Sequence, residues 1–367
     1  GASVVVVATT DGGKEQLSLK VNGKTDASTS SDVPTQLLSG HLPMFLHPNP
    51  RRTLVVGLGS GMTSSAVARH PGVERMDAVE ISPDVVEAAR LFKAHNDGIV
   101  DNPRVRIHIE DAKSFLKIVD QQYDVIISEP SNPWMAGVAA VFSREYYEDC
   151  QARLATNGVM AQWVQIYETS DRTLNMVLST FTSVFPYTSI WHPAAGDLIL
   201  IGSTEPLKVE MEQLEKRFAE PAVKADLERI EIVRLPVLLA RELVSQENGL
   251  FIAPPDTTLH SDFFPALEYV AQKDFFLRRI TEKWRQFDEN YSPRPSTLLG
   301  RYLERHPLTE ADYKAFGRYY VEHRLPESDI FRSLVLRWQR EKPDNTWPME
   351  LMTLASQGVI TAELEVL

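Results

Sequence analysis

Cysteine, long apolar runs and positive charge are all scarce in this sequence. Its 367 residues include one cysteine, Cys150, and 38 Lys and Arg against 50 Asp and Glu, so the formal net charge is −12. A single cysteine excludes an internal disulfide and a zinc site made of several thiolates. The sequence has no apolar window of about 18 residues, so no segment of it is predicted to span a bilayer. Because phosphate backbones bind basic surfaces, we predict no nucleic-acid partner.

The composition that is present is that of an ordinary globular protein, with 43% hydrophobic and 24% charged residues. A chain of this length is expected to form more than one domain. An acidic balance suits a cationic small substrate, although most acidic proteins are acidic only for solubility. We therefore expect a small-molecule ligand and no metal.

A glycine-rich turn organises the chain. Residues 53–57 form an apolar run of strand length, which ends in the alternating glycines Gly57, Gly59 and Gly61 before a predicted helix. This order of strand, turn and helix is typical of a nucleotide-binding α/β unit, where glycines let the backbone approach the ligand. Met62 stands where a dinucleotide fingerprint has its third glycine, which favours an adenosyl ligand without a pyrophosphate. Such turns also occur for packing alone, so the later strands must decide.

Strands and helices alternate from residue 53 to about residue 203, and five such βα units require a mostly parallel sheet with helices on both faces. The two strands after the fifth helix form a closing hairpin. This pattern predicts an α/β fold of the class I adenosylmethionine-dependent methyltransferase-like, or Rossmann-like, type. The predicted divisions are an N-terminal β-meander and helix (1–50), a Rossmann-like adenosyl-binding catalytic domain (51–205), connecting helices and a loop (206–274), and a C-terminal helical appendage (275–367).

The C-terminal part is predicted to be mainly helical. Residues 235–244 are expected to form an apolar helix, residues 254–265 a loop, and residues 275–287 and 347–357 further helices. Trp284, Trp338 and Trp347 are expected to be core anchors of the appendage rather than a binding platform.

Carboxylates follow the second and third strands of the predicted sheet. Glu80, followed by Ile81, comes about 20 residues after the glycines, where an acidic side chain accepts hydrogen bonds from ribose hydroxyls. Asp111, followed by Ala112, ends the third strand, where a carboxylate can accept the adenine amino group. Asp111 is equally well placed to cap the next helix, and both interpretations stay open.

The fourth strand ends in Glu129-Pro130-Ser131-Asn132-Pro133-Trp134. The two prolines and the tryptophan predict a rigid wall, with Glu129 directed into the site. A carboxylate beside a bound sulfonium can orient an amine nucleophile or accept its proton. The alternatives are that Glu129 caps a helix or pairs with an arginine, and that Asn132 and Trp134 are loop scaffolding.

Several motifs between residues 17 and 203 together resemble spermidine synthase and related polyamine aminopropyltransferases. They comprise residues 19–23, Gln36 with His41, residues 42–43 and 47–50, the glycine turn, Glu80 with Ile81, Asp111 with Ala112, residues 123–133 and residues 142–147. The family moves the aminopropyl group of decarboxylated S-adenosylmethionine onto putrescine or a similar amine and releases 5′-methylthioadenosine. The resemblance therefore implies a transferase of polyamine biosynthesis.

The resemblance also implies roles for individual residues. It places Glu80 on the ribose, Asp111 on the adenine and Gln36 near the donor, with Glu129 as the acceptor-activating carboxylate and Gln162 close by. The expected binding residues are Gln36, His41, Gly57, Gly59, Ser60, Gly61, Glu80, Ile81, Asp111 and Ala112, and the expected catalytic residues are Glu129, Asn132 and Gln162.

Two departures from the family pattern bear on the substrate. Ser60 replaces an aspartate that holds the donor's terminal amine, and Asn132 replaces an aspartate near the acceptor. Each lost charge-assisted contact is worth roughly 1.5–3 kcal/mol when buried, so we expect dicationic putrescine to be held less well. A neutral Ser60 also permits intact S-adenosylmethionine as the donor. An intramolecular lyase or cyclase, which releases methylthioadenosine without a polyamine, is therefore a second hypothesis.

Two further alternatives remain, a methyltransferase and a non-catalytic sensor of adenosyl ligands. Amine-methylating enzymes of this fold carry Asn-Pro-Pro-aromatic where this chain has Glu129-Pro130-Ser131. The segments 259–262 and 265–269 also resemble a branch in which the synthase-like domain follows a multi-helix membrane region. Since Val4 begins abruptly in a strand, we expect a soluble domain on the cytoplasmic side of a longer membrane protein, with a homodimer as a further expectation.

Overall fold

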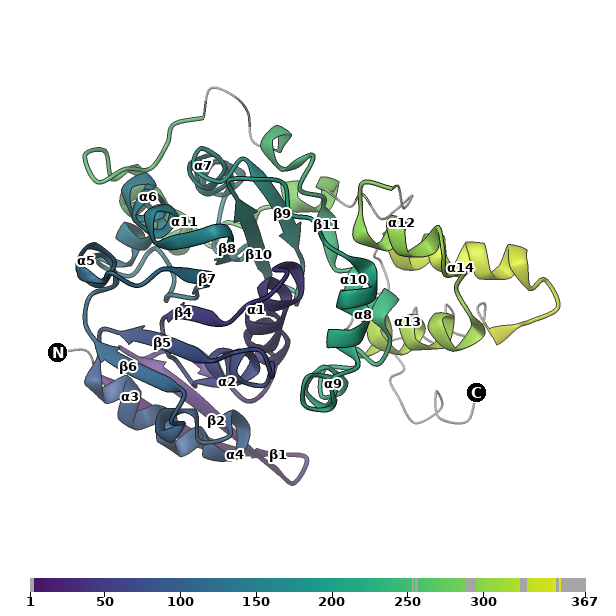
Figure 1. Ribbon diagram of the computed structural model, residues 1–367, viewed down its shortest axis with the longest axis horizontal. Helices are drawn as coiled ribbons and strands as arrows, with labels where there is room; N and C mark the ends of the chain where they lie inside the picture. The colour runs from purple at the N-terminus through teal and green to yellow at the C-terminus, as the bar shows by residue number, and fades with distance from the viewer. Residues whose placement is uncertain are drawn as a thin grey trace.

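The computed structural model describes residues 3–252, 254, 257–287, 289, 295–323, 329–347 and 350. Its N-terminal part is a three-stranded antiparallel sheet made of β1 (Val4–Asp11), β2 (Lys14–Val21) and β3 (Lys24–Ser28). Glycine turns at positive φ join these strands. Leu19 and Ala27 of the small sheet pack against α3 (Pro83–Ala89), so the predicted β-meander is confirmed (Figure 1).

The main sheet has eight strands in the order β11-β9-β10-β8-β7-β4-β5-β6. The strands β4 to β8 run parallel, and β9, β10 and β11 add antiparallel pairs at one edge. Their bounds are β4 (Arg52–Val56), β5 (Arg75–Glu80), β6 (Val105–Ile109), β7 (Tyr123–Ser128), β8 (Leu154–Gln165), β9 (Tyr187–Trp191), β10 (Asp197–Ser203) and β11 (Glu242–Val244). The predicted class I methyltransferase-like fold is confirmed.

Helices follow the parallel strands as the alternation predicts. They are α2 (Met62–Ala68), α3 with α4 (Lys93–Asn96), α5 (Ala112–Ile118), α6 (Arg144–Arg153) and α7 (Asp171–Thr182). The strand order reverses at β4, since β5 and β6 lie on one side of it and β7 and β8 on the other. In an open α/β sheet, ligands bind outside the carboxyl ends of the strands at such a reversal. The glycine turn after β4 lies at this point.

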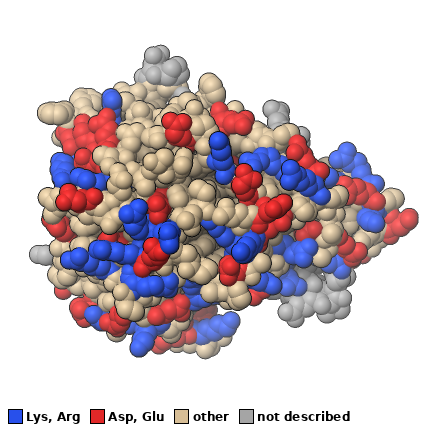
Figure 2. All heavy atoms as spheres, in the orientation of Figure 1, with Lys and Arg blue, Asp and Glu red and all other residues tan. Residues whose placement is uncertain are grey.

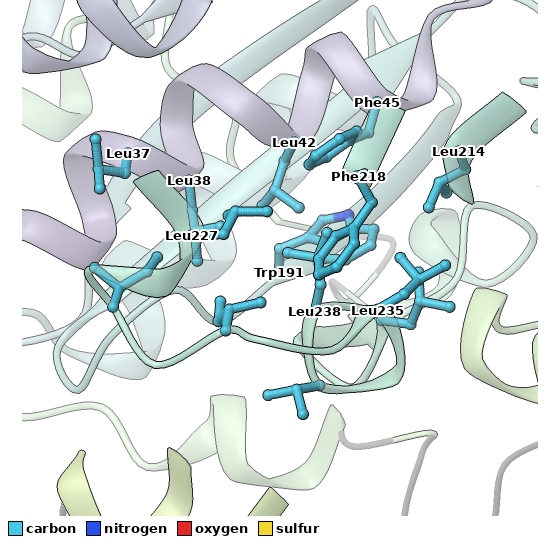
Figure 3. Close-up of a cluster of buried hydrophobic side chains, with 14 of the residues drawn as sticks. Leu37, Leu38, Leu42, Phe45, Trp191, Leu214, Phe218, Leu227, Leu235 and Leu238 are labelled. Carbon is cyan, nitrogen blue, oxygen red and sulfur yellow. The ribbon is translucent and has the colours of Figure 1, made fainter. Parts of the chain in front are cut away.

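Helix α1 (Val33–Leu46) connects the α/β fold to the C-terminal helices. On one side, Gly40 lies so close to α2 that a Cβ atom there would be 2.7 Å from the Cβ of Ala66 and 2.8 Å from the carbonyl oxygen of Thr63. On the other side, Leu38 and Leu42 point toward Leu227, Phe218 and Trp191 (Figure 3). A single apolar core therefore extends from α1 into α8 (Met211–Phe218), α9 (Pro221–Glu228) and α10 (Leu235–Leu239).

The predicted helical appendage packs onto this same core. It contains α12 (Leu298–Leu303), α13 (Glu310–Glu322) and α14 (Asp329–Glu341), beyond α8 and α10 in Figure 1. Trp338 is buried. Its ring stacks on that of Tyr313 and also packs, tilted, against that of Trp347. Trp284 is half-buried against His192. The prediction that these tryptophans are core anchors of the appendage is confirmed for Trp338 and Trp347, whereas Trp284 packs at the margin of the core of the main sheet.

Two predictions for the C-terminal part were wrong. The expected helix at 235–244 ends at Leu239, because the chain turns back and β11 pairs with the edge strand β9. The expected helix at 275–287 is instead α11 (Ala266–Phe276), followed by a short 3-10 turn at Lys283–Phe287. Helix α11 is fixed by tertiary contacts, since its buried Asp274 accepts hydrogen bonds from Ser170 at the start of α7. Most of the helix predicted at 347–357 lies outside the described residues.

Within the described ranges, no helix combines the length and apolarity needed to cross a bilayer. Figure 2 shows acidic and basic side chains interspersed over the visible face, with no large field of one sign.

We predict that Gly40→Ala destabilises the fold by about 1–2 kcal/mol. The methyl group would overlap backbone and Cβ atoms of α2, and this overpacking exceeds the roughly 1 kcal/mol gained from helix propensity. Urea unfolding measures the change. Gly72→Ala is the matched control, because its Cβ would lie 3.4 Å from its nearest neighbour, the Pro50 carbonyl oxygen. Equal stability of the two variants would contradict the role assigned to the α1–α2 contact.

Candidate active site

The candidate site lies at the carboxyl ends of β4, β5 and β7, where the strand order reverses. Gly57 has φ of 89°, and a Cβ atom there would be 2.4 Å from the carbonyl oxygen of Glu129. Gly61 has φ of 81° and lies against Ile99 and Asn96. Both positions require glycine, both for their φ and for the lack of space. The turn therefore holds its backbone next to the end of β7.

Glu80 links the end of β5 to the glycine turn. One carboxylate oxygen accepts a hydrogen bond from the Leu58 N–H at 3.0 Å, and the other accepts from the Ser82 N–H at 2.9 Å. Burial raises the pKa of Glu80, while these backbone bonds oppose the rise. Glu80 therefore holds the glycine turn in place through its carboxylate group. Each of the two carboxylate oxygens can still accept a second hydrogen bond, for example from a ligand hydroxyl.

Ser60, in the middle of the turn, is tied to α1 through Gln36. Its hydroxyl donates to Gln36 Oε1, and Gln36 Nε2 donates to the Ser28 carbonyl at 2.9 Å and to Asp32 Oδ2 at 3.1 Å. Burial raises the pKa of Asp32. The neutral hydroxyl of Ser60 is thus connected, through the Gln36 amide, to the half-buried carboxylate of Asp32, which sequence reasoning had not considered.

Glu129 follows β7, and its carboxyl group contacts the Thr63 hydroxyl at the start of α2. Burial raises the pKa of Glu129 to about 8, and the nearby carboxylates of Asp197 and Asp32 act in the same direction. The Thr63 hydroxyl also lies 2.9 Å from the Gln36 carbonyl oxygen and has only one proton to donate. The Thr63 hydroxyl is the donor toward Glu129 Oε2, and this contact lowers the pKa of Glu129 against the larger effect of burial. With a pKa of about 8, Glu129 is mainly protonated at neutral pH.

Asp197 is a second acidic residue that sequence reasoning missed. It begins β10, is 8% exposed, and accepts hydrogen bonds from the Thr35 hydroxyl at 2.7 Å and from the Trp163 indole N–H at 3.1 Å. Burial raises its pKa to about 6. Its position after the Ala-Gly turn of the closing hairpin was a weak signal, because an aspartate is also ordinary at a turn.

Asn132 and Gln162 are both fully buried, and each has an unpartnered amide oxygen within the described structure. The Asn132 amide N–H donates to the Tyr167 hydroxyl at 3.2 Å, and Gln162 donates to the Trp163 carbonyl. Burial raises the pKa of Tyr167 to about 12, and Asp197 acts in the same direction. A buried acceptor without a donor is costly, so these oxygens are positions where a ligand N–H or O–H would be stabilised.

A lysine from the small sheet reaches the loop after β7. Lys24 Nζ lies 3.0 Å from Asp26 Oδ1 and 5.4 Å from the ring centroid of Trp134. The other oxygen of Asp26 accepts a hydrogen bond from the Ser131 hydroxyl at 2.6 Å. Trp134 stacks on Phe275 of α11, with ring centroids 5.1 Å apart. The β-meander and α11 therefore both support this loop.

Not every predicted binding residue comes together here. His41 is buried near the far end of α2, where its ring nitrogens contact His70 at 3.0 Å and Asp226 at 3.3 Å. The exposed Asp111 caps α5 by accepting from the Ser114 N–H at 2.9 Å. Ile81 is 70% exposed, and Ala112 is buried in the first turn of α5. Within the described residues, no cluster of three or more His, Cys, Asp or Glu has metal-holding geometry.

Comparison with known proteins identifies the region that carries this site. Residues 35–193 match the family model described as the spermine/spermidine synthase domain. The spermidine synthase of Dictyostelium discoideum is 35% identical over 142 residues, which are 39% of this chain and 50% of that protein. The polyamine aminopropyltransferase of Thermotoga maritima is 28% identical over 171 residues, 47% of this chain and 58% of that protein.

These matched regions cover about half the length of the curated relatives. The crystal structure of spermidine synthase from Thermotoga maritima is 24% identical, with a TM-score of 0.46, and the match covers 62% of this chain and 88% of that one. The assignment rests on the sequence matches. Residues 35–193 of this chain therefore form a domain that matches the spermine/spermidine synthase domain and is similar in sequence to spermidine synthases and polyamine aminopropyltransferases.

Proposed function

We propose that this chain is an aminopropyltransferase-like enzyme that cleaves an adenosyl sulfonium on its propyl side and releases 5′-methylthioadenosine. The observation that carries the proposal is a set of four carboxylates around the glycine turn. Glu80 and Asp197 are buried, and Asp32 and Glu129 are half-buried. Burial raises the pKa of each of them, and within the described residues none forms an ion pair with a basic side chain. Uncompensated buried carboxylates favour a cationic ligand, because its charge offsets their desolvation.

The adenosyl part is proposed to bind along β4, β5 and β6. The glycine turn offers close approach to the backbone, and Glu80 has free acceptor positions for ribose hydroxyls. Asp111 uses Oδ1 for the helix cap, so its second oxygen is proposed to accept the adenine amino group. Gln36 and Ser60 lie beside the turn and face the donor's propyl amine in this arrangement.

Glu129 is proposed as the base for the attacking amine. The amine nitrogen forms a bond to the methylene carbon next to sulfur, the carbon–sulfur bond breaks, and its electron pair stays on the neutral thioether. The nitrogen then releases a proton to Glu129. A bound sulfonium or ammonium lowers the pKa of Glu129, because an opposite charge favours the ionised form. The carboxyl group therefore ionises when the substrate that needs it arrives.

The intramolecular reaction is the second candidate. It is favoured by the neutral Ser60, whose hydroxyl is held by Gln36, since no charge at that position repels the carboxylate of intact S-adenosylmethionine. In this case the substrate's own amine or carboxylate attacks the carbon next to sulfur. The product nucleoside is again methylthioadenosine, but no polyamine is consumed.

One experiment separates these reactions. The protein is incubated with decarboxylated or intact S-adenosylmethionine, with and without 1,4-diaminobutane, and products are identified by mass spectrometry. Methylthioadenosine formed only with the diamine supports transfer, whereas its formation from S-adenosylmethionine alone supports the lyase. S-adenosylhomocysteine as product would overturn both in favour of a methyltransferase. Binding without turnover would favour a sensor.

The membrane-linked location and the homodimer remain predictions from the resemblance.

Glu129→Gln is expected to lower kcat at least about 100-fold, because an amide cannot accept the proton. Methylthioadenosine affinity should be nearly unchanged, since the amide keeps the contact with Thr63. Turnover and calorimetric binding are measured side by side. Glu148→Gln, on the exposed face of α6, is the control and should keep full activity. Undiminished turnover in Glu129→Gln would remove this residue from the mechanism.

Glu80→Gln is expected to weaken every adenosyl ligand by about 1.5–3 kcal/mol, through loss of charge-assisted bonds to the ribose. In the variant, the side-chain amide N–H would also face the backbone N–H of Leu58 or Ser82, so one of these two hydrogen bonds would be lost. Calorimetry with methylthioadenosine measures the change. Glu87→Gln, an exposed residue of α3, is the matched control. Equal affinities of the two variants would reject the ribose assignment.

The value of kcat/KM for transfer is expected to rise with pH and level off above about pH 8. The pKa of Glu129 in the free protein is about 8, so below it the carboxyl is neutral and activity falls about tenfold per pH unit. The acceptor amine also titrates, so profiles are compared for two amines of different pKa. The part of the pH profile that reflects Glu129 should lie at the same pH for both amines, whereas the part that reflects the amine should shift with the amine's pKa. A profile that shifts as a whole with the pKa of the amine would contradict the prediction.

A further inference from the structure

The backbone of Glu129 is held more firmly than its side chain. Its N–H donates to the Val56 carbonyl oxygen at 2.9 Å, and its own carbonyl oxygen would lie 2.4 Å from a Cβ atom on Gly57. The side chain has several rotatable bonds and is half-buried. A base must keep its carboxylate within hydrogen-bond reach of the proton that it accepts. A neighbouring group is therefore needed to hold this side chain.

The Thr63 hydroxyl is the group that holds the Glu129 carboxylate. It donates to Glu129 Oε2, and within the described residues the carboxylate has no other hydrogen-bond partner. Thr63 belongs to the first turn of α2, directly after the glycine turn. The contact therefore joins the start of α2 to the residue that follows β7.

Thr63 is itself fixed by the packing of α2 against α1. It is 3% exposed, and its carbonyl oxygen would lie 2.8 Å from a Cβ atom on Gly40. Its hydroxyl also lies 2.9 Å from the carbonyl oxygen of Gln36 on α1. A β-branched side chain has few allowed rotamers. The close contact between the two helices therefore determines where this hydroxyl points.

The hydroxyl also opposes the other influences on Glu129. Burial raises the pKa of Glu129 to about 8, and Asp197 at the start of β10 and Asp32 before α1 act in the same direction. The hydrogen bond from Thr63 lowers the pKa of Glu129. Within the described residues no basic side chain forms an ion pair with Glu129. Thr63 is therefore the described neighbour that stabilises the ionised carboxylate.

We propose that Thr63 is a positioning residue for Glu129, because its hydroxyl orients the carboxylate and stabilises the ionised form that accepts a proton. The inference rests on the proposed function for the role of Glu129 as the base. In that reaction the proton leaves the amine nitrogen and goes to Glu129, while Thr63 keeps its own proton. Thr63 thus acts through Glu129 and not on the reacting atoms.

The kinetic test replaces the hydroxyl with a methyl group of similar size. Thr63→Val removes a charge-assisted hydrogen bond and should raise the pKa of Glu129 by about one unit or more. The rise of kcat/KM with pH should move up by the same amount, so that kcat/KM at neutral pH falls at least about tenfold. Thr63→Ser keeps a hydroxyl and should return the rise to the wild-type pH.

Thr182→Val is the matched control, because Thr182 is a buried threonine of α7 whose hydroxyl donates to the Leu178 carbonyl oxygen at 2.9 Å. Its pH profile should equal that of the wild type. A merely structural role of Thr63 would lower activity without moving the profile. A profile of Thr63→Val that rises at the wild-type pH, whatever its height, would therefore overturn the proposal.

A second measurement does not depend on turnover. Protein isotope-labelled at the glutamate carboxyl carbons is titrated by NMR, and the Glu129 signal is assigned by its absence in Glu129→Gln. The midpoint is expected near pH 8 in the wild type, and at least about one pH unit higher in Thr63→Val. Calorimetric binding of methylthioadenosine verifies that each variant is folded. Equal midpoints in the wild type and Thr63→Val would overturn the proposal.

The two measurements separate this inference from the proposed function. A raised midpoint in Thr63→Val without any turnover of the wild type would overturn the transferase assignment, but leave Thr63 as the residue that controls Glu129. Turnover by the wild type with equal midpoints would overturn the role of Thr63 but leave the transferase.

Discussion

The close contact between α1 and α2 at Gly40 is the constraint on which the candidate site depends. Helix α2 starts from the glycine turn, and α1 carries Gln36, which holds Ser60 and accepts from Thr63. Thr63 in turn contacts Glu129. If the two helices were farther apart, the glycine turn and the end of β7 would lose the hydrogen bonds that connect them. A missing side chain on α1 is thus what allows the two halves of the site to share hydrogen bonds.

The second organising feature is electrostatic. Four carboxylates lie around the glycine turn, and within the described residues none of them forms an ion pair with a basic side chain. Burial raises the pKa of Glu129 to about 8 and that of Asp197 to about 6. A cationic ligand would lower both pKa values, because an opposite charge favours the ionised form.

The sequence was sufficient to predict the α/β core, because strands with glycine turns and carboxylates at their ends form a local pattern. It also led to Glu80, Glu129 and Gln36, which lie beside recognisable motifs and which the structure places around the glycine turn, while their roles stay predictions. It was not sufficient for Asp32 and Asp197, which reach the site only through the packing of α1 and the pairing of β10 with β8. His41 shows the opposite case, since a motif residue turned away because the helix periodicity places it on another face than Gln36. The strand β11 required an exposed sheet edge, which no local pattern of residues 242–244 reveals.

Trp134 is supported by residues that lie outside the region matched by the family model. The family domain ends at residue 193, yet Trp134 stacks on Phe275 from α11 and faces Lys24 from β3. Both supports lie outside the matched region. A recombination event that exchanged residues 35–193 alone would keep the glycine turn and the loop after β7 but lose both supports of Trp134. In this chain, the matched domain is therefore smaller than the set of segments that support the candidate site.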